Sequence, residues 1–243
     1  MGETILVASG KGGTGKSVIT VNLGALLAKR GFKVLLLDMD MGMRNLDLYL
    51  GLENKVIYNV MDVLSGLCRI SQALIKDTRF QDLYLMSTCP RKDGRDVTPL
   101  HMEVLGRKLK GDFDFIFVDC PAGIGEGLDA AAASADKALI VTEPDIAAIR
   151  DADILNRYLY QMGFRKTCYV VNKVRADLME QQMVPNLKEI SEALNSQLVG
   201  IIQFDDNIHI FGNQGIPVVF KEGTYIEENF KNILIRLLRS SDR

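Results

Sequence analysis

Eight residues near the start of the chain have the clearest chemical meaning, because GKGGTGKS fits the spacing G-x-x-x-x-G-K-[ST]. An apolar run that resembles a strand precedes them and a helical pattern follows, which is the context that this motif requires. Glycines let successive backbone N–H groups turn toward phosphate oxygens, and the start of the helix adds partial positive charge. The spacing therefore predicts a nucleotide-binding loop made of Gly10, Lys11, Gly12, Gly13, Thr14, Gly15, Lys16 and Ser17.

Three side chains of this loop have expected roles. Lys16 supplies a mobile cation for the β- and γ-phosphates, and the hydroxyl of Ser17 can bind Mg²⁺. Lys11 is unusual, because a nucleotide that Lys16 and Mg²⁺ already neutralise has little need of a second lysine from the same chain. We expect Lys11 to reach the phosphates of a second subunit. A solvated loop lysine is the alternative that the spacing leaves open.

Three carboxylates follow strand-like runs and complete the expected site. Asp119 ends FIFVD and precedes a glycine-bearing loop, so we expect it to hold Mg²⁺ through a water molecule. Asp38 and Asp40 end LLLDMD, and residues i and i+2 of an extended chain face the same side. Both would therefore point to one site, where they hold the waters of the metal or orient a water for attack on the γ-phosphate. Exposed acids at strand ends are the simpler alternative.

Strand-like and helical runs alternate along the chain, and several strand-like runs are continuously apolar, as in strands covered on both faces. We expect strands at 4–9, 33–38, 83–86, 113–119, 137–142, 167–172, 198–202 and 217–220. Helices are expected at 17–30, 151–162, 186–194 and 225–238. The alternation predicts an α/β fold, a doubly wound, mostly parallel sheet flanked by helices on both faces. Residues 1–243 are expected to form a single domain.

The composition excludes several classes of protein. With 47% hydrophobic residues, 25% charged residues and a formal net charge of −2, the chain is neither disordered nor basic enough to favour nucleic acid binding. No stretch reaches the roughly 20 apolar residues that a membrane-spanning helix needs. The four cysteines, Cys68, Cys89, Cys120 and Cys168, show no CxxC spacing, which favours reduced thiols in a cytoplasmic protein.

Together these residues resemble the deviant Walker A ATPases, the ParA/MinD family of P-loop proteins, and most of all the MinD-like members that determine the septum site. The resemblance covers residues 1 to about 238. It rests on the loop with its signature lysine and on DMD at 38–40, GMRNLD at 42–47, QALIKD at 72–77, DCPAGI at 119–124, RDAD at 150–153 and NQGIP at 213–217. GMRNLD and QALIKD are specific to the MinD-like members.

The resemblance implies a homodimer that forms when both subunits bind ATP, with ATP or ADP and Mg²⁺ as cofactors. Lys11 would cross to the phosphates of the partner subunit. Asp40 would position the attacking water, with Asp38 beside it as part of the same switch. Asn45 would shape the γ-phosphate side of the site, and Asp119 would be the Walker B carboxylate.

Three further positions take their roles from the resemblance. Asp145 and Asp151 match acidic positions that pair with the signature lysine or line the dimer and partner surface. Asn172 matches the adenine-binding asparagine, and its amide carries the donor and the acceptor that suit adenine. NKVR at 172–175 also favours ATP over GTP, because a guanine site of the NKxD type needs an aspartate where Arg175 stands.

The function that the resemblance implies is a switch that helps to place the division septum and is reset by slow, Mg²⁺-dependent ATP hydrolysis. A MinC-like division inhibitor and an ATPase activator are the implied partners. The last helix, about 225–238, is expected to pack on the core, with no basic membrane-targeting tail after it. We therefore expect a cytoplasmic protein without direct membrane binding, and peripheral membrane association is the alternative.

Other functions remain open from the sequence. A FlhG-like regulator of flagellar number usually carries a segment before the first strand, whereas the first strand here starts at Thr4. A ParA-type DNA segregation ATPase needs a basic surface on a chain that is slightly acidic. An iron–sulfur carrier of this superfamily needs cysteines at its site, and Cys120 is the one cysteine beside Asp119.

Overall fold

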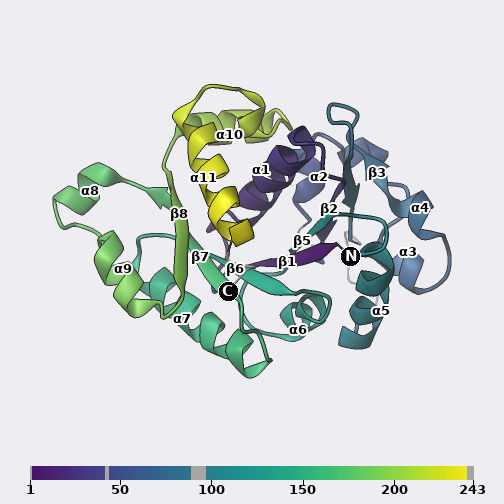
Figure 1. Ribbon diagram of the computed structural model, residues 1–243, viewed down its shortest axis with the longest axis horizontal. Helices are drawn as coiled ribbons and strands as arrows, with labels where there is room; N and C mark the ends of the chain where they lie inside the picture. Colours follow the sequence, from purple (N-terminus) through teal and green to yellow (C-terminus); the bar gives the residue numbers. More distant parts are fainter. Residues whose placement is uncertain (1, 42–43, 89–96, 240–243) are drawn as a thin grey trace.

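The computed structural model describes residues 2–41, 44–88 and 97–239, and the strands within these ranges form one sheet (Figure 1). The strand order is β3-β4-β2-β5-β1-β6-β7-β8, and all neighbours run parallel except β3 and β4. The strands are β1 (Glu3–Ala8), β2 (Val34–Asp38), β3 (Ile75–Lys76), β4 (Leu83–Met86), β5 (Phe115–Asp119), β6 (Lys137–Thr142), β7 (Thr167–Val174) and β8 (Gln197–Gln203). The predicted, mostly parallel sheet is confirmed.

Helices cover both faces of the sheet, with α1, α10 and α11 on one side and α6 and α7 on the other (Figure 1). The helices are α1 (Lys16–Lys29), α2 (Leu46–Tyr49), α3 (Val60–Leu64), α4 (Ile70–Ala73), α5 (Pro99–Leu109), α6 (Glu126–Ala132), α7 (Ile146–Gln161), α8 (Ala176–Glu180), α9 (Leu187–Ala193), α10 (Asp206–Asn213) and α11 (Tyr225–Arg239), with 3₁₀ turns η1 (Glu53–Lys55) and η2 (Val218–Phe220). The doubly wound arrangement is therefore confirmed, and none of the helices in the described ranges is both long and apolar enough to span a bilayer.

The core explains why the strands are apolar without alternation. Ile5 and Val7 of β1 pack with residues of α1 and α11, whereas Leu6 and Ala8 pack with residues of α5, α6 and α7. All four side chains are fully buried. Because each face of the sheet is covered by helices, most residues of the central strands are apolar, and the few polar ones, such as Thr4 and Lys137, are buried as well.

The sequence located most elements closely. The strands at 83–86 and 137–142 have the predicted bounds, and the helix at 225–238 ends one residue later, at Arg239. The helix expected from residue 151 begins five residues earlier, because Asp145 caps it by accepting a hydrogen bond from the backbone N–H of Ala148.

The strand predicted at 217–220 is wrong. Residues Val218–Phe220 form the 3₁₀ turn η2. Pro217 lacks the N–H that a ladder needs, and the N–H of Val219 donates to Oδ1 of Asn22 in α1 instead of to a strand. The apolar side chains of Val218 and Val219 are buried in the core beside α1, so burial without a strand produced the misleading pattern.

The parallel strands bring the chemically interesting residues to one edge. The phosphate loop follows β1, Asp38 ends β2, Asp119 ends β5 and Glu143 follows β6. Asp119 is level with Val7 of β1 and with Asp38 of β2 in the sheet register. Strand β1 lies between β5 and β6, where the winding of the chain reverses, and ligands of open α/β sheets bind at such points.

Candidate functional site

The phosphate loop has a shape that favours glycine at three of its positions, and one of these is Gly13 with a φ of 81°. Gly15 precedes α1 with a φ of 96°, and a Cβ there would lie 2.3 Å from Nδ2 of Asn172. A Cβ at Gly10 would lie 2.5 Å from the backbone carbonyl of Asp151 in α7. Both contacts would clash, so the two glycines let the loop pack against β7 and α7. A Cβ at Gly12 or Gly13 would meet nothing within 4 Å, which leaves the middle of the loop open.

Asn172 braces this loop from β7. Its Nδ2 donates to the carbonyl oxygen of Thr14 at 2.8 Å, and the residue is only 6% exposed. The predicted contact of Asn172 with adenine stays a prediction. The structure adds a role that the sequence did not suggest, because the side chain amide fixes the backbone of the loop just before α1.

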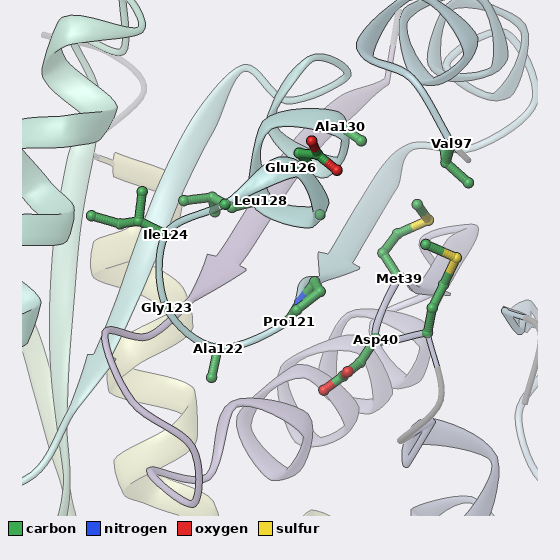
Figure 2. A pocket seen from close by; sticks show the side chains of 13 residues that line it. Met39, Asp40, Val97, Pro121, Ala122, Gly123, Ile124, Glu126, Leu128 and Ala130 are labelled. Atoms are coloured by element: carbon green, nitrogen blue, oxygen red, sulfur yellow. The ribbon is translucent and has the colours of Figure 1, made fainter. Parts of the chain in front are cut away.

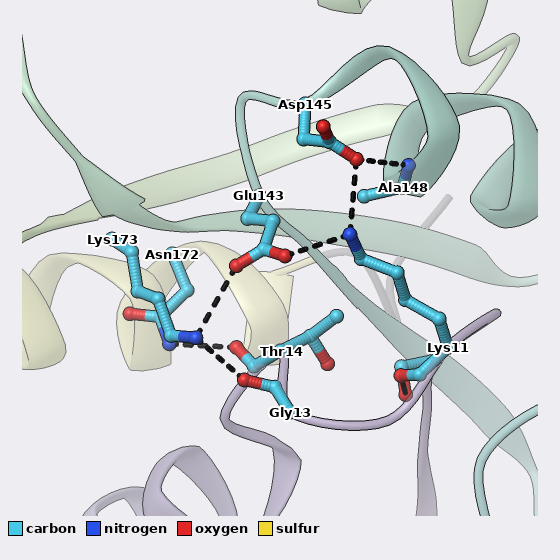
Figure 3. A network of polar contacts seen from close by, with 9 residues as sticks. Lys11, Gly13, Thr14, Glu143, Asp145, Ala148, Asn172 and Lys173 are labelled. Atoms are coloured by element: carbon cyan, nitrogen blue, oxygen red, sulfur yellow. Dashed lines mark hydrogen bonds and ion pairs between the residues drawn. The ribbon is translucent and has the colours of Figure 1, made fainter.

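Lys11 lies at the exposed end of the loop and is held by two acids (Figure 3). Its Nζ lies 2.9 Å from Oδ1 of Asp145 and 3.0 Å from Oε1 of Glu143. The hydrogen bond with Asp145, followed by that with Glu143, raises the pKa of Lys11, and the Lys11 bond lowers the pKa of Asp145. The predicted pairing of Asp145 with the signature lysine is thus present within a single chain.

Glu143 and Lys173 extend this network and were missed from the sequence. Glu143 also pairs with Nζ of Lys173 at 3.3 Å, and Nζ of Lys173 donates to the carbonyl oxygen of Gly13 at 2.6 Å (Figure 3). Glu143 thus links the two lysines on either side of the loop. One signal was present, because Glu143 follows the predicted strand 137–142 at the edge where ligands bind.

Ser17 and Asp119 form the corner of the site that suits a metal ion. Oγ of Ser17 donates to Oδ2 of Asp119 at 2.6 Å. Oδ1 of Asp119 is buried and accepts no hydrogen bond from the described part of the chain. Burial raises the pKa of Asp119 to about 7, with the Asp38 charge adding to the rise and Lys16 opposing it. A hard cation such as Mg²⁺ prefers oxygen ligands of this kind, so the residues present fit the predicted metal.

Asp38 is committed to the protein backbone. It is fully buried, and its carboxylate accepts hydrogen bonds from the N–H groups of Asp40 at 3.0 Å, Asn45 at 3.0 Å and Leu46 at 3.1 Å. Burial raises its pKa to about 6, against the effect of these donors. Asp38 therefore shapes the turn that leads into α2.

The prediction that Asp38 and Asp40 follow the alternation of one extended strand is wrong. Strand β2 ends at Asp38 and the chain turns there, so the alternation of an extended chain does not apply. Asp40 is half-buried, which raises its pKa, while the charge of Lys16 opposes that rise. The two carboxylates still lie close to the same site, because Asp38 is level with Asp119 in the sheet register and the N–H of Asp40 donates to Oδ1 of Asp38.

Asp40 borders a cavity of about 500 Å³ between the turn after β2 and the loop after β5 (Figure 2). Residues 121–128 form much of the wall, and Glu126 lies across the cavity from Asp40 (Figure 2). The carboxylate of Asp40 therefore has room for a water molecule beside it, unlike that of Asp38.

Two further predicted residues, Asn45 and Asp151, lie next to the site. Asn45 precedes α2 next to Asp38, whereas Gly42 and Met43 of GMRNLD lie outside the described residues. Asp151 packs its backbone against the phosphate loop, and its carboxylate lies 3.6 Å from Arg150. It therefore lies beside the site, but it pairs with Arg150, whereas Lys11 pairs with Glu143 and Asp145.

The cysteines in the described ranges carry no bridge. Cys68, Cys120 and Cys168 are free thiols, and Cys89 lies outside those ranges. Cys120 Sγ donates to the carbonyl oxygen of Val7, so the one cysteine beside Asp119 is bound inside the core. No cluster of three or more His, Cys, Asp or Glu side chains suited to a metal ion occurs in the described ranges.

A doubly wound sheet with G-x-x-x-x-G-K-[ST] between its first central strand and the following helix defines a nucleotide-binding protein of the P-loop class. The family model of the CobQ/CobB/MinD/ParA nucleotide binding domain matches residues 5–218. The septum site-determining protein MinD of Bacillus subtilis is 41% identical over 243 residues, which is 99% of this chain and 91% of that protein. The chain therefore belongs to the MinD/ParA family and, within it, to the MinD group.

Other comparisons agree. The MinD protein of Synechocystis is 40% identical over 238 residues, covering 98% of this chain and 90% of that protein. The solved MinC:MinD complex of Aquifex aeolicus has a chain with a TM-score of 0.90 and 37% identity, covering 98% of this chain and 96% of that one. A ParA family ATPase from Chlorobium tepidum has a TM-score of 0.81 at 18% identity, a likeness of fold alone. The family and fold expected from the sequence are confirmed.

Proposed function

We propose that this protein is an ATP-dependent dimer switch that helps to place the division septum, and that slow, Mg²⁺-dependent hydrolysis of ATP resets it. The observation that carries the proposal is the position of Lys11. This lysine belongs to a phosphate loop that already contains Lys16, and Asp145 and Glu143 hold it with 34% of its side chain exposed, where a second subunit could reach it. Identities of about 40% to MinD proteins over almost the whole chain support this function rather than flagellar regulation or DNA segregation.

In the proposed site, the open middle of the loop binds the phosphates through backbone N–H groups and Lys16. Ser17 and, through water, Asp119 would hold Mg²⁺, which would supply charge neutralisation at the β- and γ-phosphates, while the buried Asp38 supports the turn beside them. A solved MinD of Pyrococcus horikoshii was obtained with Mg-ADP, which supports this assignment. Asn172 reads adenine from β7, next to the loop that it braces.

Hydrolysis needs one water molecule on the open side of the γ-phosphate. Asp40 orients it, because its half-buried carboxylate borders the cavity that could admit it. The water oxygen bonds to the γ-phosphorus, the bond from that phosphorus to the β–γ bridging oxygen breaks, and ADP and hydrogen phosphate form while one proton of the water is released to solvent. Asn45, fixed by the buried Asp38, shapes the γ-phosphate side.

Dimerisation requires Lys11 to exchange partners. In the single chain it neutralises Asp145 and Glu143, and in the dimer it would neutralise phosphates of the partner's nucleotide. The chain loses the ion pairs of Lys11 with Asp145 and Glu143, each of which contributes only about 0–1 kcal/mol near the surface, and gains a charge-assisted contact with phosphate. ATP offers one more phosphate than ADP, so the exchange favours the dimer when ATP is bound.

Two kinds of protein partner follow. A MinC-like division inhibitor is supported by the solved MinC:MinD complex, whose title names that pairing for the Aquifex aeolicus protein. An activator that speeds ATP hydrolysis would return the dimer to the ADP-bound state. Catalysis of phosphoryl transfer is mostly positioning, so a partner protein can complete the catalytic site. We place this cycle in the cytoplasm, with Asp145 and Asp151 near the surface that the second subunit or a partner meets.

Light scattering with size exclusion tests the proposal. The wild-type chain is expected to elute as a dimer with Mg-ATP and as a monomer with Mg-ADP. Lys16→Ala should stay monomeric with either nucleotide, while Lys188→Ala, which changes a lysine side chain that is 86% exposed, should behave as the wild type. An unchanged ATP-dependent dimer in Lys16→Ala would refute the proposed mechanism.

A further inference from the structure

Three segments distant in sequence meet at one guanidinium group, namely the turn after QALIKD, the end of α2 and NQGIP. Arg79 follows QALIKD in the turn between β3 and β4, and it chelates Asp77 of that motif through Nε at 2.9 Å and Nη2 at 2.6 Å. Nη2 also donates to the carbonyl oxygen of Leu50 at 2.6 Å, just after GMRNLD and α2. Nη1 donates to the carbonyl oxygen of Gly215 in NQGIP at 2.7 Å. None of the proposed chemistry accounts for this convergence.

The carbonyl of Leu50 that Arg79 holds is connected through α2 to the proposed γ-phosphate side of the site. Helix α2 ends at Tyr49, immediately before Leu50. It starts after Asn45, and the N–H groups of Asn45 and Leu46 donate to the buried carboxylate of Asp38. One short helix therefore joins the proposed γ-phosphate residues to the carbonyl that Arg79 holds.

The carbonyl of Gly215 that Arg79 holds is connected through α10 to the proposed adenine-binding side of the site. Helix α10 precedes Gly215 and is capped by Asp205, directly after Phe204. The N–H of Phe204 donates to the carbonyl oxygen of Val174 at 2.9 Å, two residues beyond Asn172 in β7. One helix therefore joins the loop beside Asn172 to the second carbonyl that Arg79 holds.

The two helices touch without spare room near Arg79. A Cβ at Gly215 would lie 2.6 Å from Cα of Gly51, and a Cβ at Gly212 would lie 3.0 Å from the ring of Tyr49. A displacement of α2 therefore has to move α10, because well-packed elements transmit strain instead of absorbing it. The carboxylate of Asp77 is almost fully buried, which fixes the guanidinium between the two carbonyls.

We propose that Arg79 is a positioning residue that couples the γ-phosphate side of the site to its base side, by holding the end of α2 and the end of α10 in one hydrogen-bonded unit. The γ-phosphate would then tighten α10 as well as α2. The inference rests on the proposed function, which supplies the adenine nucleotide and places its γ-phosphate beside Asn45 and its base beside Asn172. A lysine could not replace Arg79, because a single ammonium cannot chelate Asp77 and reach both carbonyls in the planar geometry of the fork.

Hydrogen exchange measured by mass spectrometry tests the coupling. The full chain carries Lys11→Ala so that subunits stay monomeric, and light scattering checks that state. Exchange is compared with Mg-ADP and with Mg²⁺ and a non-hydrolysable ATP analogue. With Arg79 present, the γ-phosphate should slow exchange by about fivefold, a usual size for coupling between sites, both at 46–52 and at 206–215.

Arg79→Gln should keep the slowing at 46–52 and lose it at 206–215. Arg79→Lys should do the same, and it serves if the glutamine variant does not fold. Arg107→Gln is the matched control, because it removes an arginine that pairs with Glu103 on the exposed face of α5, and both segments should still respond. A purely structural arginine would speed exchange in all states without abolishing the response of one segment alone.

Two results would overturn the inference: a response at 206–215 that survives in both Arg79 variants, or no response there when Arg79 is present. Failure of the proposed function would be recognised separately. In that case Mg-ADP would not protect the phosphate loop, residues 10–17, in any variant.

Discussion

The two lysines of the phosphate loop are five residues apart, yet their surroundings differ in kind. Lys16 begins α1, is only 8% exposed, and lies near enough to Asp40 and Asp119 to oppose the rise in their pKa values. Lys11 keeps 34% of its side chain exposed and is held by acids from outside the loop. The inner end of the loop is thus built as a fixed site, whereas the outer end holds a charge that can change partners.

The largest expected effect separates the two ends by affinity. Lys16→Ala should weaken Mg-ADP binding by about 100-fold, because charge-assisted bonds to phosphate contribute about 1.5–3 kcal/mol each and Lys16 has no substitute in the loop. Lys11→Ala should leave the affinity for Mg-ADP within about threefold. In the single chain Lys11 pairs with Asp145 and Glu143, and such pairs near the surface contribute little. Titration calorimetry on both variants measures the difference, and equal losses would mean that the two ends do not differ in function.

The second effect concerns hydrolysis at the inner end. Asp40→Asn should lower the rate of phosphate release by about 100-fold, the usual cost of a misplaced reactant, while Mg-ADP affinity stays the same. A phosphate-release assay gives the rate. Asp153→Asn changes an acid that pairs with Arg157 on α7, so it serves as the control and should hydrolyse ATP normally. Full activity of Asp40→Asn would mean that another residue orients the attacking water.

The thermal stability of the chain should also depend on pH, through the two buried carboxyls at the inner end of the loop. Burial raises the pKa of Asp38 to about 6 and that of Asp119 to about 7, from an ordinary value of 3.8. The folded chain binds these protons more tightly than the unfolded chain, so their stabilisation is complete below about pH 4 and is lost as the pH rises through 6 and 7. Without nucleotide, Tm should therefore fall by about 5 °C between pH 5 and pH 8.

Differential scanning calorimetry checks this slope. Asp119→Asn should flatten it, because one of the two titrating groups is removed. Mg-ADP should flatten it as well, since a metal ion favours ionised Asp119. A melting temperature that rises over the same range would show that the two carboxyls are ionised in the folded chain.

The smallest effect is expected at the outer end. Asp145→Asn keeps a good helix cap for α7 but removes one charge that holds Lys11. Lys11 then leaves its pair more easily, and the ATP-dependent dimer should tighten by about threefold, in keeping with the small contribution of an exposed pair. Sedimentation at several protein concentrations gives the dimer constant. A weaker dimer would place Asp145 in the interface instead of in competition with it.

The contrast between the two ends of the loop also shows which site residues could be predicted from the sequence. The inner end was predicted residue by residue, because Lys16, Ser17 and Asp119 occupy fixed places in a motif or at a strand end. The outer end was predicted only through Asp145. Glu143 and Lys173 belong to β6 and β7 regions that are distant in sequence, and their contacts with Lys11 and Gly13 exist only after the sheet has formed.

The fold shows a similar limit. Long apolar strands were located within two residues, because burial on both faces leaves a strong local pattern. The strand expected at 217–220 failed, because its apolar residues are buried by contact with α1, which no local pattern records. The short strand β3 was missed, since two residues carry no periodicity.

The sequence by itself determined the sheet class, the phosphate loop and the family, because these depend on local spacing and on the hydrophobic pattern of each segment. The tertiary structure alone decided which groups became partners. It turned Asp38 into a buried support for α2, paired Lys11 with Glu143 and Asp145, and brought three separate segments together at Arg79. Such contacts depend on distances between elements, and those distances are set only when the helices pack on the sheet.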